Sequence, residues 1–362
     1  MKLSGYKVLN EAFRFEKATL SFDEEILSLT QEDGDDFNGY IIPGLVDIHT
    51  HGVMGEDSMC VEKYDDYVYF MYSNGITTFY PTSVTASVED MEKMVSFFRE
   101  KEEIEGINIE GPYINAKMRG AHDDKLICEG DIGVLYRVQE LAGNKIKLIT
   151  VAPEIGQNLE FIAKATEMGI KVSLGHTACD YETAVTAFDA GADHVTHLFN
   201  AMSPLHHRQS GLIGAAFDKP FYTEIICDGI HVVPEVVRMA YKVLGSDRMI
   251  LISDCMSATG LGDGEYMLGG LHVTVDDSIA RTDDGAIAGS TSSLYDMVRS
   301  VVRMGIPMEE AIKMATLTPA KSVNESKIGM IKPGMQADFV ILDKDFSVVQ
   351  TVKKGKTVYS VL

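Results

Sequence analysis

The central part of the chain, residues 44–327, alternates short apolar runs with amphipathic stretches, and this alternation narrows the choice of fold more than any other feature. Helical periodicity occupies connecting stretches such as 87–103, 157–168, 180–190 and 234–244. Eight candidate strands occur, at 44–51, 75–83, 106–113, 147–154, 171–177, 193–200, 222–231 and 249–257. Eight strand–helix units over about 280 residues predict a (β/α)8 TIM barrel. A doubly wound open sheet is the alternative, but it usually has fewer strands and carries a glycine-rich phosphate turn after the first.

The two ends of the chain have a different, β-rich character. Residues 1–43 and 328–362 contain short alternating runs separated by turn sequences such as "QEDGDDFNG", "KPG" and "KKGK". We therefore predict an α/β chain with two domains, a barrel over 44–327 and a small β-sandwich domain assembled from both termini. Two segments interrupt the barrel pattern: an irregular connection at 199–220 and a β-hairpin at 261–290.

Charge and composition exclude several classes of partner. The net charge of −22 argues against nucleic acid and anionic membranes, which favour basic surfaces. Apolar runs stay far short of the ~20 residues of a membrane-spanning helix, and the first twenty residues lack the apolar core of a signal peptide, so we expect a cytoplasmic protein. The five cysteines show no CxxC spacing, and we interpret them as mostly buried free thiols.

The first barrel strand ends in "PGLVDIHTHG", residues 43–52. Side chains alternate along a strand, so His49 and His51 share one face with Leu45 and Asp47. Two imidazoles spaced in this way can bind one cation. The motif by itself is equally compatible with two ordinary loop histidines.

The other candidate ligands decide between these two interpretations. Catalytic groups of a barrel lie at the C-terminal ends of its strands. Those ends carry, or lie next to, a set of imidazoles and carboxylates: His49, His51, Glu110, His176, His197, His231 and Asp254. Such ligands favour Zn, Fe, Mn, Co or Ni, and these cations activate water for hydrolysis. The remaining histidines have simpler interpretations: we expect His194 and His272 to be structural, and His206 and His207 to be solvated.

Several motifs occur in a specific order along nearly the whole chain. They are "PGLVDIHTHG", "IEGPYIN", "GAH", "SLGHT", "HVTHLFNAMSPL", "CDGIHV", "SDCMSATG" and "GMIKPGMQADFVILD". In this order they resemble the amidohydrolase superfamily and, within it, the N-acetylglucosamine-6-phosphate deacetylases. In that group a glutamate at the end of the third strand replaces the carboxylated lysine of relatives such as dihydroorotases. Glu110 matches it, and the fourth strand ends in "TVAPE" without a lysine.

The resemblance implies a role for each motif residue. Glu110, His176 and His197 would bind a primary divalent metal, while His49 and His51 would help bind a second one that shares Glu110. Some family members lack this histidine pair and use one metal, so the pair permits a binuclear site. Asp254 matches the general base and acid, and His122 matches the residue that polarises the acetamide carbonyl.

The resemblance also implies how the substrate is bound. Arg208 matches an arginine that reaches across from a neighbouring subunit to the sugar phosphate, which implies a homodimer. His231 would join it, and Asn200 and Ala201 would add further contacts. The expected reaction is hydrolysis of N-acetylglucosamine 6-phosphate to glucosamine 6-phosphate and acetate. The galactosamine epimer as substrate, a cyclic amidase or nucleobase deaminase, and a catalytically inactive scaffold protein are the alternatives.

Overall fold

The core of the protein is a curled parallel β-sheet. The computed structural model describes residues 1–361, and among them eight strands match the eight predicted runs: β5 (Leu45–Thr50), β8 (Ile76–Pro81), β9 (Ile107–Glu110), β10 (Ile146–Val151), β11 (Lys171–Leu174), β12 (His194–Val195), β13 (Tyr222–Ile225) and β14 (Met249–Leu251). Strands β9 to β14 pair in chain order, and β5 pairs with β8. Parallel bridges from Thr82 to Asn108 and from Thr50 to Cys255 connect this pair to both edges of the longer sheet. The pairing therefore returns to its first strand, which is consistent with a TIM-like barrel.

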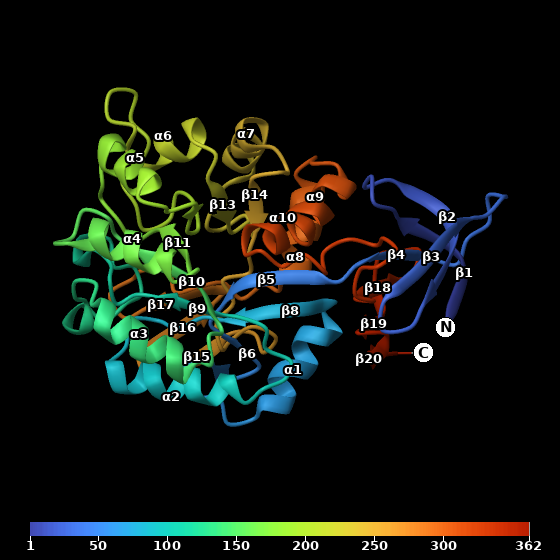
Figure 1. The fold of residues 1–362 in the computed structure, drawn as a ribbon, viewed down its shortest axis with the longest axis horizontal. Coiled ribbons are helices and arrows are strands. Elements are labelled where there is room, and N and C mark those ends of the chain that lie inside the picture. The colour runs from blue at the N-terminus through green and yellow to red at the C-terminus, as the bar shows by residue number, and fades with distance from the viewer. Residues whose placement is uncertain (362) are drawn as a thin grey trace.

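The α-helices lie outside the sheet (Figure 1), and each of them buries some of its side chains. Helix α8 shows the pattern, because Leu294, Met297, Val298 and Val301 are buried at the spacing of one helical face, and a capping box starts it at Ser293. The other α-helices are α1 (Tyr64–Ser73), α2 (Val88–Arg99), α3 (Ile132–Leu141), α4 (Asn158–Glu167), α5 (Tyr181–Asp189), α6 (Gly211–Asp218), α7 (Pro234–Leu244), α9 (Met308–Met314) and α10 (Leu317–Ser322), with α8 spanning Leu294–Arg303.

The two predicted interruptions are both present, with differences in detail. The connection after β12 is irregular up to residue 210, but helix α6 then forms despite its two glycines. Packing explains this helix, because Leu212, Ile213, Ala215 and Ala216 are all buried. The predicted hairpin has a third strand, and it consists of β15 (Gly264–Leu268), β16 (Leu271–Asp276) and β17 (Ile279–Thr282).

Strands from the two chain ends form one mixed sheet of seven, which we call the terminal sheet. Its order is β20-β19-β18-β4-β1-β2-β3. The predicted two-sheet sandwich is therefore not confirmed. The strands are β1 (Lys2–Leu9), β2 (Phe15–Phe22), β3 (Ile26–Gln31), β4 (Tyr40–Pro43), β18 (Phe339–Leu342), β19 (Val348–Lys353) and β20 (Lys356–Ser360), with a small pair β6 (Gly52–Val53) and β7 (Glu56–Asp57) beside the core. Figure 1 shows both termini at this sheet.

Buried polar contacts connect the terminal sheet to the parallel core. The ammonium group of Lys353 is buried and donates to the backbone oxygen of Thr77 at 2.7 Å and to the carboxylate of Glu105 at 3.1 Å. The hydroxyl of Thr351 donates to the backbone oxygen of Tyr72 at 2.7 Å. Unsatisfied buried donors are costly, so these bonds hold strand β19 in one position against the core.

The structure also bears on the predictions for the cysteines and for membrane-spanning helices. Cys179, Cys227 and Cys255 are buried, whereas Cys60 and Cys128 are exposed, and all five are free thiols, as predicted. Among the described residues, no helix has the length and apolar character needed to cross a membrane.

Candidate active site

The candidate ligands converge at the carboxyl ends of the parallel strands. His49 lies in β5, Glu110 is the last residue of β9, and the other ligands follow strand ends within a few residues. The backbone at these points is unusual, because His176, His197 and Asp254 have φ angles of 47°, 27° and 48°. Positive φ is uncommon outside glycine, and such strain gathers at functional sites.

Glu110, His176 and His197 form a buried group that we call the primary triad. Oε1 of Glu110 lies 3.2 Å from Nε2 of His176 and 3.0 Å from Nε2 of His197. The two Nε2 atoms are themselves 3.0 Å apart. Three potential ligand atoms thus face one point, as in a site for a single cation.

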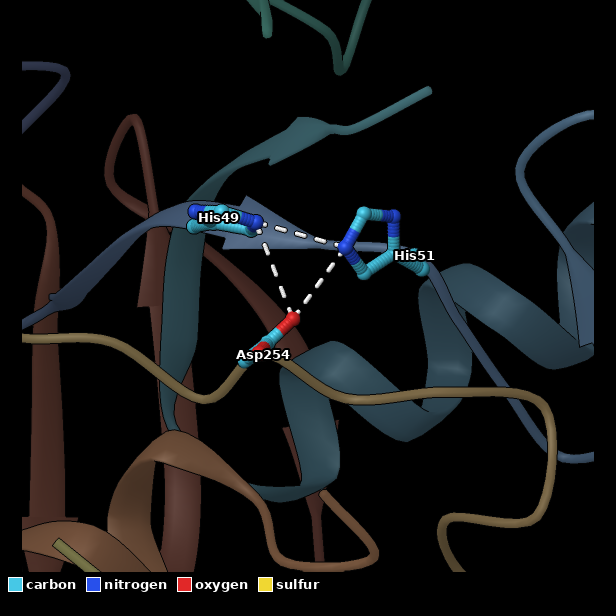
Figure 2. A group of neighbouring side chains, drawn as sticks. All are labelled: His49, His51 and Asp254. Carbon is cyan, nitrogen blue, oxygen red and sulfur yellow. Dashed lines mark hydrogen bonds and ion pairs between the residues drawn. The ribbon is translucent and has the colours of Figure 1, made fainter. Parts of the chain in front are cut away.

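His49, His51 and Asp254 form a second triad (Figure 2). Oδ1 of Asp254 lies 3.1 Å from Nε2 of His51 and 3.6 Å from Nε2 of His49. The other oxygen of Glu110, Oε2, lies 3.2 Å from Nε2 of His51 and 3.5 Å from Nε2 of His49. Glu110 therefore lies between the two triads and presents one oxygen to each.

The hydrogen bond behind one histidine ring of each triad fits a cation site. Nδ1 of His176 lies 2.8 Å from the backbone oxygen of Met118, and Nδ1 of His51 lies 3.3 Å from that of Thr82. These acceptors carry no proton, so each Nδ1 donates and each Nε2 of the neutral ring presents a lone pair to the triad. Lone pairs that face one another across 3 Å, beside a carboxylate, are the donor set of a borderline divalent cation.

The electrostatics of the ion-free protein support the same interpretation. Burial would raise the pKa of Glu110, but the charges of His49 and His176 hold it well below its usual value. Burial also opposes ionisation of Asp254, yet the hydrogen bond from His51 and the charges of His49 and His51 lower its pKa to about 2. The carboxylates are therefore ionised, and a cation would replace protons that the imidazoles otherwise hold.

His122 has the opposite tautomer from the triad histidines. The backbone N–H of Thr85 donates to its Nδ1 at 3.0 Å, so the proton of the neutral ring is on Nε2. Burial and the nearby His176 lower the pKa of His122 to about 4, which keeps the ring neutral. Nε2 lies 3.5 Å from Oε2 of Glu110. His122 therefore presents a neutral hydrogen-bond donor beside the triads.

A cavity of about 260 Å³, which we call the site cavity, opens onto this cluster. Its apolar wall includes Val84, Ala121, Ile226, Leu268 and Ile287. The rest of its lining contains nine of the predicted site residues: His51, Glu110, His122, His176, His197, Asn200, Ala201, His231 and Asp254. His49 lies directly behind the lining and is fully buried.

Arg208 is the predicted site residue that this chain does not bring to the cavity. It lies in the exposed loop after β12 and outside the cavity lining, with Nη1 2.7 Å from Nε2 of His207. Its expected contact with the active site of a neighbouring subunit stays a prediction. His231, by contrast, is held at the cavity by Asp228, whose Oδ2 lies 2.7 Å from its Nδ1.

The histidines that were expected to lie outside the site do so. His194 is fully buried away from the cavity, with Nδ1 2.7 Å from the carboxylate of Asp193. His272 lies between two exposed carboxylates on the surface of the three-stranded sheet, and His206 and His207 are exposed.

Two residues in the site were missed by sequence reasoning. Glu224 is buried in β13, and its Oε2 lies 3.0 Å from Nδ1 of His49. A signal for it existed, because a glutamate inside the apolar run "YTEIICDG" requires a partner. Thr85 acts through its backbone N–H, which no sequence pattern reveals.

Comparison with known proteins places this geometry in a family. The family model described as "Amidohydrolase family" matches residues 40–358. The chain is 35% identical to the N-acetylglucosamine-6-phosphate deacetylase of Vibrio furnissii, over 88% of this chain and 83% of the relative. It is 32% identical to the N-acetylgalactosamine-6-phosphate deacetylase of Escherichia coli O157:H7, over 91% of this chain and 89% of that relative.

A solved structure extends the similarity to the whole fold. It is that of a variant N-acetyl-D-glucosamine-6-phosphate deacetylase from Mycobacterium smegmatis in complex with N-acetyl-D-glucosamine-6-phosphate. The two chains superimpose with a TM-score of 0.94 at 30% identity, and the match covers 99% of each. The chain therefore belongs to the amidohydrolase family.

Proposed function

We propose that this protein hydrolyses the acetamide of N-acetylglucosamine 6-phosphate to glucosamine 6-phosphate and acetate. The observation that carries the proposal is the position of Glu110 between two triads, with His122 and Asp254 lining the same cavity. Relatives that match most of the chain are deacetylases of this kind. The catalytic domain would be a (β/α)8 barrel over 44–327, with residues 1–43 and 328–362 forming the small β domain.

The triads would hold the divalent cation that this reaction requires. Glu110, His176 and His197 would hold the primary ion, and the second triad would hold another that shares Glu110. The donor set suits Zn, Fe, Mn, Co or Ni. When bound, such an ion acidifies water and polarises the amide carbonyl.

Asp254 and His122 supply the proton transfers and hydrogen bonds. The ionised carboxylate of Asp254 accepts a proton from the attacking water and delivers it to the sugar nitrogen as the C–N bond breaks. Nε2–H of His122 donates a hydrogen bond to the carbonyl oxygen as negative charge develops there. The water oxygen ends in acetate, and the nitrogen leaves as the amine of the sugar.

The remaining predicted residues would orient the sugar. Asn200, Ala201 and His231 line the cavity, where they can contact the sugar and its substituents. Arg208 of the neighbouring subunit would bind the phosphate in a homodimer, since a guanidinium matches phosphate geometry. This contact would place one cationic group at the entrance of the site cavity, in a protein whose net charge is −22.

N-acetylgalactosamine 6-phosphate is the second candidate substrate. The similarity to a deacetylase of that epimer from Escherichia coli favours keeping it. A cyclic amidase or deaminase is less favoured, because Glu110 stands where relatives such as dihydroorotases use a carboxylated lysine.

An acetate-release assay with both hexosamine phosphates, repeated with each candidate metal, tests the proposal. We expect acetate from one epimer or both, and far less from unphosphorylated N-acetylglucosamine, which serves as the control for phosphate recognition. Ring opening of dihydroorotate without acetate release from either sugar would contradict the proposed function.

A further inference from the structure

Glu224 is a buried carboxylate with a single hydrogen-bond partner among the described residues, His49. Its side chain is fully buried on the inner side of the curled sheet. Oε2 lies 3.0 Å from Nδ1 of His49, whereas Oε1 has no hydrogen-bond partner among the described residues. Burying a carboxylate is costly, and within residues 1–361 no lysine or arginine forms an ion pair with Glu224. The hydrogen bond with His49 is therefore the contact that compensates for burying this carboxylate.

This contact crosses the interior of the sheet. His49 lies in β5 and Glu224 in β13, and β14 lies between these strands in the pairing order. The two residues are separated by 175 positions in the chain. A rigid parallel strand thus delivers a carboxylate to the rear of one candidate ligand.

The other triad histidines have no such partner. Nδ1 of His176 and Nδ1 of His51 face backbone oxygens, and Nδ1 of His197 has no hydrogen-bond partner among the described residues. A carboxylate raises the basicity of an imidazole ligand and fixes its orientation. Of the two triads, only the second contains a histidine supported in this way, so the triads differ in the hydrogen bonding of their imidazoles.

We propose that Glu224 is the positioning residue that sets the cation affinity of the second triad. Its carboxylate accepts a hydrogen bond from Nδ1–H of His49. This bond holds the ring so that Nε2 faces His51 and Asp254. The carboxylate also adds negative charge behind this triad, whereas the primary triad depends on Glu110 alone. The inference rests on the proposed function for the presence of a divalent cation at the site.

Titration of ion-free, full-length protein with Co²⁺ tests the role of Glu224. Calorimetry gives the number and affinity of ions, and the visible absorption of Co²⁺ reports the ligand set. We expect the wild-type protein to bind two ions and Glu224→Ala to bind the second ion about 10–100-fold more weakly, with the first unchanged. Glu224→Gln keeps an acceptor but loses the charge, so its second-ion affinity should lie between these two.

Asp193→Asn is the matched control. Asp193 also bonds a buried histidine, His194, at 2.7 Å, but outside the site, so its loss should leave both affinities unchanged. If Glu224→Ala does not fold, Glu224→Gln decides, because it preserves the shape of the side chain.

Three results would overturn the inference. They are a wild-type protein that binds a single ion, Glu224 variants with wild-type affinity for the second ion, and equal weakening of both ions together with lost thermal stability. Acetate release from the wild-type protein is measured separately. A protein that binds two ions but releases no acetate would contradict the proposed function and leave the role of Glu224 intact.

Discussion

The backbone N–H of Thr85 donates a hydrogen bond of 3.0 Å to Nδ1 of His122. The Thr85 hydroxyl lies 2.8 Å from the same nitrogen and can donate as well. Both contacts keep the proton of the neutral ring on Nε2, which faces the triads. The tautomer of His122 is thus set by a residue on another loop, 37 positions away in the chain.

We predict that His122→Ala lowers kcat/KM about 10²–10³-fold, the usual cost of one lost donor to a developing oxyanion. Cation content should stay at the wild-type level, because His122 belongs to neither triad. Steady-state kinetics and metal analysis on the same sample check both points. Thr85→Val keeps the backbone N–H and should remain close to wild type. A loss as large as that of His122→Ala would show that the hydroxyl, and not the amide, sets the tautomer.

Asp254→Asn should lower kcat about 10²–10⁴-fold, because an amide cannot carry the proton from water to the leaving nitrogen. The fold should persist, since asparagine tolerates the positive φ of 48° found at this position. Thermal unfolding and metal analysis should show a folded protein with the primary ion bound. Retained turnover would remove Asp254 from the proposed role.

Arg208→Ala should raise KM for the phosphorylated sugar and change turnover of an unphosphorylated one little. In a homodimer with contacts in trans, mixing Arg208→Ala with Asp254→Asn should restore activity. A mixed dimer then has one complete site, so random exchange in an equimolar mixture gives about a quarter of wild-type activity for a two-fold symmetric dimer. Each variant alone is the control. A mixture no more active than its components would place Arg208 outside the neighbouring site.

Asp228 provides a pH-dependent contribution to stability. Its carboxylate accepts backbone N–H groups of Ile230 and His231 at 2.8 Å and bonds Nδ1 of His231. Burial raises the pKa of Asp228, but the contacts with His231 outweigh this and lower it below the usual value. A pKa lower in the folded state means that the stabilisation is complete above the unfolded-state value of about 3.9 and is lost as pH falls through the folded-state value.

Asp228→Asn should therefore lower the free energy of unfolding by about 1.5–3 kcal/mol at pH 7, the usual worth of hydrogen bonds to a charged group. The difference from wild type should shrink once the pH falls below about 4, where the carboxyl of the unfolded wild-type chain begins to be protonated while that of the folded protein stays ionised. Urea unfolding at pH 7 and pH 3.5 measures both differences. An equal difference at the two pH values would contradict the assigned charge.

Much of the architecture could be predicted because periodicity reports burial. The alternation at 44–51 and 106–113 identified strands whose ends carry His49, His51 and Glu110, and parallel strands bring such ends to one edge. The same reasoning separated His194, at the start of a strand, from His197, beyond its end. Alternation says less about how strands pair, so only the structure gives the order of the seven terminal strands, and the predicted sandwich is not confirmed.

The sequence by itself determined which residues stand at the strand ends, because local periodicity and motif order are written along the chain. Only the tertiary structure decided what lies behind those residues. Glu224 reaches His49 across the inside of the sheet, and Thr85 reaches His122 through a backbone amide. Such contacts depend on the curl of the sheet and the course of its loops, so they arise when distant segments pack together.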